Sequence, residues 1–123
     1  MGEVMMPRRG SGGLKMEMGS YVGTGTYGKN NPNSLTFSFD PKFVYLCMES
    51  FGPDFHGMIF QITEDKKVLP FSISSKSSLY PKYLQVSISG KTITWYTTAS
   101  GGSESYYQLN GEKNTTYYTA IGI

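Results

Sequence analysis

The chain offers few residues whose types and spacing could support catalysis. His56 is its only histidine and Cys47 its only cysteine. A hydrolase triad would set His56 beside a nucleophile such as Ser50 or Cys47 and a carboxylate such as Asp54, but the spacing does not support this arrangement. One histidine and one cysteine are also too few for a structural zinc site. We therefore predict no enzyme activity and no catalytic, cofactor or metal site, and we interpret His56 as a surface-loop histidine.

A second pattern, Gly23-x-Gly25-x-x-Gly28, matches the dinucleotide-binding fingerprint letter by letter. That fingerprint works only where the loop opens a helix whose N-terminus holds the pyrophosphate. Residues 29–33 read Lys-Asn-Asn-Pro-Asn and lead into a strand pattern, so the sequence offers no such helix. Glycines with positive φ in a loop explain the pattern better than a nucleotide does.

Tyrosine is the residue type present in excess, with 10 copies. Two adjacent pairs, 106–107 and 117–118, fall in segments with strand character, where one member of each pair must face outward. Exposed tyrosines on a rigid sheet suit sugar stacking and protein interfaces alike, and they also form favourable cross-strand pairs without any ligand. All three interpretations stay open. The candidate ligand or interface residues, with loops 27–33 and 51–56 as rims, are Tyr27, Phe51, Phe55, His56, Tyr96, Tyr106 and Tyr117.

The strands that would position these side chains are organised around residues 34–48. Leu35, Phe37 and Phe39 alternate with polar residues, which is the pattern of a strand with one solvated face over residues 34–40. Pro41 ends that strand because it lacks a backbone N–H. Residues 43–48 are apolar on both faces, which predicts a central strand covered on both sides, with Cys47 as a small core residue.

Shorter strand patterns, separated by turn signals, fill the rest of the chain. Pro70 indicates an edge strand, and Ser89-Gly90 is the predicted two-residue connection of the clearest hairpin. About eight short strands with no convincing helix predict an all-β fold, an antiparallel β-sandwich. We expect a flexible arm over residues 1–13 and one domain over residues 14–123. The further strands are expected at residues 15–22, 58–62, 68–73, 83–88, 91–96, 104–109 and 115–123.

The charge and hydropathy of the chain exclude two classes of partner. The net charge is only +2 and the basic residues are scattered, so binding to a nucleic-acid backbone is not expected. No apolar run approaches the roughly 20 residues that a membrane-spanning helix needs, so membrane insertion is not expected either.

Three parts of the sequence together resemble a known family. They are residues 19–28 leading into 31–37; residues 39–44; and residues 93–96 with 108–111 and the closing 116–122. The chain from about residue 15 to 123 resembles the small β-rich domains that end bacteriophage and prophage tail fibres or other virion-surface proteins. It is more loosely similar to H-type lectin sandwiches, which assemble as trimers and bind sugars.

The resemblance implies a virion protein, made in the bacterial cytoplasm, that forms a homotrimer. Our first hypothesis for its function is a receptor-binding domain that recognises a bacterial cell-surface glycan. A structural subunit of the baseplate, tail or capsid is the alternative. In that case the arm of residues 1–13 would anchor the chain to other phage proteins. The resemblance implies neither a cofactor nor a nucleic-acid partner.

Overall fold

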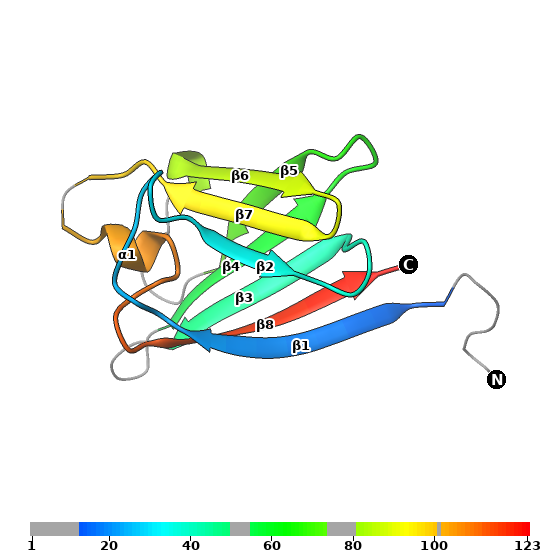
Figure 1. Cartoon of the computed structure of the whole chain (residues 1–123), viewed down its shortest axis with the longest axis horizontal. Helices are drawn as coiled ribbons and strands as arrows, with labels where there is room; N and C mark the ends of the chain where they lie inside the picture. The colour runs from blue at the N-terminus through cyan, green and yellow to red at the C-terminus, as the bar shows by residue number, and fades with distance from the viewer. Residues whose placement is uncertain (1–12, 50–54, 74–80, 101) are drawn as a thin grey trace.

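The computed structural model describes residues 13–49, 55–73, 81–100 and 102–123, and over these ranges the fold is all-β. Eight strands form two antiparallel sheets that pack as a sandwich (Figure 1). The larger sheet has the order β1-β8-β3-β4-β5 and the smaller one β2-β7-β6. The predicted fold class is therefore confirmed. The strands are β1 (Lys15–Val22), β2 (Asn33–Thr36), β3 (Phe43–Glu49), β4 (Phe55–Ile62), β5 (Val68–Ser72), β6 (Leu84–Ser89), β7 (Thr92–Thr97) and β8 (Thr115–Gly122).

The hydrophobic core lies between the two sheets. Trp95 of β7 meets Phe60 of β4 edge-to-face, with ring centroids 5.3 Å apart. Phe37 meets Tyr118 of β8 in the same manner, at 5.9 Å. Burying each of these large side chains contributes roughly 1.5–3 kcal/mol to folding. The fully buried side chains of Leu46, Met48, Met58 and Ile93 belong to the same hydrophobic core.

In residues 34–48 the predicted apolar pattern is confirmed only for the side chains that face the core. Phe37 and Phe39 are buried as expected, but strand β2 ends at Thr36 and the chain then bends. Strand β3 is central, between β8 and β4. Its outer face is not covered, however, because Phe43 and Tyr45 are 45% and 40% exposed. The expectation of a strand buried on both faces was wrong, and Cys47 lies partly exposed on that outer face instead of in the core.

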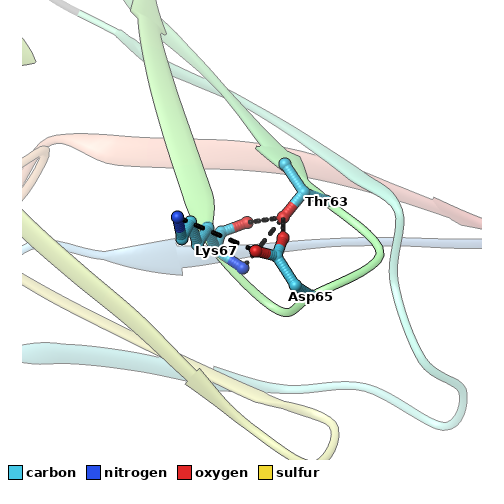
Figure 2. Close-up of polar contacts among 3 residues, drawn as sticks. All are labelled: Thr63, Asp65 and Lys67. Carbon is cyan, nitrogen blue, oxygen red and sulfur yellow. Dashed lines mark hydrogen bonds and ion pairs between the residues drawn. The ribbon is translucent and has the colours of Figure 1, made fainter.

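Strands β4 and β5 are joined by the charged turn of residues 63–67, and β5 lies at the sheet edge, as Pro70 predicts. Figure 2 shows Thr63 at the base of this turn, where its hydroxyl donates to Asp65 and accepts from the backbone N–H of Lys67 at 3.0 Å. An exposed ion pair of 3.7 Å joins Lys67 and Asp65. Lys66 adopts a positive φ of 65°, and its N–H donates to the Thr63 carbonyl.

The structure corrects the sequence prediction at three further places. Strand β4 begins at Phe55, three residues before the predicted start, so His56 lies in a strand and not in a surface loop. The β6–β7 hairpin turns at Gly90-Lys91, one residue later than predicted, and Gly90 has a φ of 59°. The predicted strand at 104–109 is wrong, because Glu104–Tyr107 form the one-turn helix α1.

Candidate functional site

A pocket lies at the end of the sandwich where the loop after β1 meets the segment after α1. Its volume is about 340 Å³, and it is open to solvent. Amide and hydroxyl side chains dominate the lining, with one tyrosine and one tryptophan among them. We call it the amide pocket, and its lining residues are Tyr21, Thr24, Thr26, Asn31, Pro32, Asn33, Ser34, Leu35, Trp95 and Asn110.

Gln108, which is fully buried, fixes the loop that forms one wall of the amide pocket. Its Nε2 donates to the Asn31 carbonyl at 2.7 Å and to Asn33 Oδ1 at 2.9 Å. Its Oε1 accepts from the backbone N–H groups of Gly28 at 2.8 Å and Thr97 at 3.0 Å. All four hydrogen-bonding positions of this amide are therefore used, as a buried polar group requires.

Asn110, two residues after Gln108 in the sequence, holds an earlier part of the same loop. Its Nδ2 donates to Thr24 Oγ1 at 2.9 Å and to the Thr26 carbonyl at 2.8 Å, and its Oδ1 accepts from the Thr24 N–H at 3.2 Å. Its backbone carbonyl accepts from Gly25 N–H at 2.8 Å. Because the loop contains no regular structure, these side-chain bonds replace the sheet ladder that would otherwise hold it.

Two aromatic side chains in the lining donate hydrogen bonds to the backbone carbonyl groups of residues 108 and 109. The Tyr21 hydroxyl donates to the Leu109 carbonyl at 2.8 Å and accepts from Asn33 Nδ2 at 3.3 Å. The Trp95 indole N–H donates to the Gln108 carbonyl at 2.8 Å. Burial raises the pKa of Tyr21 to about 12, against the opposing effect of its side-chain hydrogen bonds. Tyr21 therefore stays neutral at physiological pH.

The amide pocket is thus electrically neutral and rich in groups that both donate and accept hydrogen bonds. No carboxylate, lysine, arginine, histidine or cysteine lines it. Within the described ranges, no group of three or more His, Cys, Asp or Glu residues could hold a metal ion. A neutral polar ligand with hydroxyl groups fits this lining better than an anion or a cation does.

The structure brings part of one predicted rim to the amide pocket. Asn31, Pro32 and Asn33 of the 27–33 loop line it, whereas Tyr27 stands beside it with its side chain 46% exposed. The other predicted rim is only partly described, because Phe51 lies outside the described residues and only the backbone of Phe55 is described.

The remaining predicted site residues are spread over other surfaces. His56 faces the inner side of β4, and its ring lies 6.1 Å from that of Tyr106 in α1, which is partly buried. Tyr96 lies on the outer side of the smaller sheet, beside a depression of about 190 Å³. Tyr117 is 51% exposed on the outer side of the larger sheet.

Gln108, Asn110 and Tyr21 are the positioning residues that the sequence prediction missed as site residues. The segment Gln108-Leu-Asn-Gly111 contributes only to the family resemblance, and the residue types at 104–109 predict a strand. Nothing in their spacing indicates burial, since glutamine and asparagine are mostly exposed in proteins. Leu109, with a φ of 60°, could not have been recognised as left-handed from its residue type.

No protein-family model matches the chain, and no curated protein sequence matches it. Among solved structures, the fold is similar to part of a tailspike protein, gp49 of the Acinetobacter baumannii bacteriophage Fri1, described as a capsular polysaccharide depolymerase. The two share 8% sequence identity at a TM-score of 0.41. The match covers 88% of this chain but only 17% of the tailspike chain.

No helix in the described ranges combines the length and apolar character that crossing a bilayer requires.

Proposed function

We propose that this chain is a bacteriophage virion-surface domain of the tail-fibre, receptor-binding type that recognises a bacterial cell-surface glycan through the amide pocket. The observation that carries the proposal is the lining of that pocket, where neutral amide and hydroxyl side chains lie together with Tyr21 and an edge of the buried Trp95. Sugars present hydroxyl groups and weakly apolar ring faces, which such a lining complements.

The rigidity of the pocket wall supports the same function. Gln108 and Asn110 hold the loop through bonds to residues that lie 75 to 86 positions away in the sequence. A ligand meeting this wall would not have to order it first, which lowers the entropic cost of binding. Sequence features contribute independently, since the order of residues 19–44, 93–96 and 108–122 resembles the terminal domains of phage tail fibres.

The rest of the proposal concerns assembly. The domain of residues 14–123 acts as a homotrimer on the phage particle, and residues 1–13 connect it to other virion proteins. The domain is a non-catalytic binding module, which fits a pocket whose lining holds no histidine, lysine or carboxylate to activate its serine and threonine hydroxyls.

The test is binding of the purified full chain to an array of bacterial surface glycans, with two neighbouring asparagines compared. Asn31 lines the pocket and its side chain makes only one exposed hydrogen bond, to the Tyr27 carbonyl at 3.3 Å. Asn30 is exposed and does not line the pocket. We expect Asn31→Ala to lower the affinity for the bound glycan about tenfold and Asn30→Ala to leave it unchanged. Equal binding by both variants, or no binding by the wild-type chain to glycans of its own host, would refute glycan recognition here.

A second candidate function, a purely structural virion subunit, is favoured by the exposed apolar side chains on the larger sheet, such as Phe43, Tyr45 and Tyr117. Such a surface suits packing against neighbouring chains. Cross-linking of assembled particles distinguishes the two functions. A structural subunit would cross-link to baseplate, tail or capsid proteins through both its sheet and residues 1–13, and particles lacking it would fail to assemble. A receptor-binding domain would be dispensable for assembly and required for adsorption to the host.

A further inference from the structure

The outward side of the five-stranded sheet carries most of the large apolar side chains that the described part of the chain leaves exposed. Exposed fractions reach 71% for Met18, 62% for Val22, 56% for Met16 and 51% for Tyr117. We call this surface the outer face, and its large exposed members are Met16, Met18 and Val22 of β1, Tyr117 of β8, Phe43 and Tyr45 of β3, and Leu69 and Phe71 of β5.

The strand register shows that these side chains form a continuous surface. In one row across all five strands, Met18 lies opposite Thr119, which lies opposite Tyr45, followed by Ile59 and Phe71. A parallel row, two residues along each strand, contains Met16, Ile121, Phe43, Gln61 and Leu69. Neighbouring rows on one face lie about 7 Å apart, so their side chains touch.

A third row extends the apolar character toward the end of the sheet where β4 begins. Tyr117 lies opposite Cys47, which lies opposite Gly57. A Cβ on Gly57 would stand 2.7 Å from Ile73 Cγ1, because the Ile73 side chain lies across this glycine. Isoleucine thus fills the place that the missing side chain leaves, and the surface has no polar gap there.

The inner side of the same sheet packs against the smaller sheet, whereas no described strand or helix lies on its outer side (Figure 1). Half-exposed side chains of this size present on the order of 100 Å² each. Eight of them therefore present roughly 800 Å², more than the largest apolar patch of a typical monomer. This is the area that each partner contributes to an interface of standard size.

The chemistry of the outer face indicates which partner covers it. In the three described rows there is no charged side chain, and Glu49 stands at their end. A different protein partner commonly meets a surface with mixed polar and charged groups, whereas interfaces between identical subunits are more apolar. A face whose three rows carry no charged side chain can also be covered by further copies of the same chain without burying an unpaired charge.

We propose that the outer face is the surface through which copies of this chain associate. The inference does not depend on glycan binding, because the amide pocket lies at the end of the sandwich and shares no residue with the outer face. This proposal places Tyr117, one of the predicted site residues, in a contact between subunits.

The experiment is the solution mass of the full chain by sedimentation, over a range of concentrations from about 1 to 100 µM. The wild-type chain is expected as an oligomer, with a mass that is a multiple of 13.6 kDa. Tyr45→Lys, at the centre of the face, places a charge in the contact and should raise the dissociation constant about 100-fold or more. Because Tyr45 is 40% exposed in the single chain, the variant monomer should keep its β-sheet circular dichroism.

Tyr27→Lys is the matched control, since Tyr27 is a similarly exposed tyrosine outside the outer face. It should leave the mass of the oligomer unchanged. A wild-type monomer at 100 µM would overturn the inference and would point to a different protein as the partner. A Tyr45→Lys variant that stays folded and oligomeric would overturn it as well. Glycan binding by the Tyr45→Lys monomer, measured on the same array, separates a failure of this inference from a failure of the proposed function.

Discussion

Gln108 Nε2 lies 2.9 Å from Asn33 Oδ1, and this bond joins the end of helix α1 to the first residue of strand β2. The two residues are 75 positions apart in the sequence. Asn33 also lines the amide pocket, so a fully buried amide supports the pocket wall from behind. The geometry of the pocket therefore depends on a residue that no ligand would touch.

Replacing Gln108 by leucine tests this dependence. Gln108→Leu would leave two backbone N–H groups and two oxygens without their hydrogen bonds, so we expect it to lower the free energy of unfolding by about 3 kcal/mol. That corresponds to a fall in Tm of roughly 10 °C for a domain of this size. Gln85→Leu is the control, since Gln85 is exposed on β6, and it should change Tm by less than about 2 °C. Similar Tm values for both variants would contradict the supporting role of Gln108.

Gly23 gives a second test of the loop. A Cβ at this position would stand 2.0 Å from the Gly111 carbonyl oxygen, and neither backbone segment can move without breaking the bonds between Gly23 and residues 113 and 114. We expect Gly23→Ala to destabilise the chain by about 2–4 kcal/mol, measured by urea denaturation. At Gly13 a Cβ would meet nothing within 4 Å, so Gly13→Ala should be neutral. A neutral Gly23→Ala would mean that the two loops do not approach each other in this way.

Tyr21 predicts a specific dependence of stability on pH. Its folded-state pKa is raised to about 12 from the ordinary tyrosine value of 10.0, because burial disfavours the phenolate. The folded chain therefore holds this proton more tightly than the unfolded chain does. The stabilisation is fully present below pH 10 and is lost as the pH rises from about 10 to 12.

The comparison with Tyr21→Phe isolates this contribution from that of the other tyrosines. At pH 7 the variant should be less stable by about 1 kcal/mol, because it loses the hydroxyl bond to the Leu109 carbonyl. Between pH 10 and 12 the wild-type chain should lose stability relative to the variant, as followed by urea denaturation at each pH. If the difference in unfolding free energy between the wild-type chain and Tyr21→Phe stays constant up to pH 12, the raised pKa of Tyr21 is contradicted.

The sequence predicted the fold well wherever one face of a strand is apolar and the other is polar. Leu84, Val86 and Ile88 point inward on β6, and Ile93 and Trp95 do so on β7, as their alternation indicates. The error at β3 has a physical cause. A strand that is apolar on both faces indicates that something covers both faces, but it does not indicate whether the cover is part of the same chain.

The candidate site was harder to predict than the fold. Residues 104–109 contain two tyrosines and a leucine, which favour a strand by type. The chain instead makes one helical turn that places Gln108, Leu109 and Asn110 in the interior, where their hydrogen bonds reach the loop after β1. Such long-range hydrogen bonds leave no periodic signal in the sequence, so the amide pocket cannot be predicted from the sequence alone.

A bacterial glycan bound in the amide pocket would change the surroundings of the backbone amides that line the pocket. The most direct measurement is the change in backbone amide NMR shifts of the ¹⁵N-labelled chain when it is titrated with a surface polysaccharide fragment of its host. We predict that the largest shifts fall on the lining residues, such as Asn31, Ser34 and Asn110, while strands β4 and β5 stay unchanged. Shifts confined to the outer face, or none at saturating glycan, would contradict glycan recognition by the amide pocket.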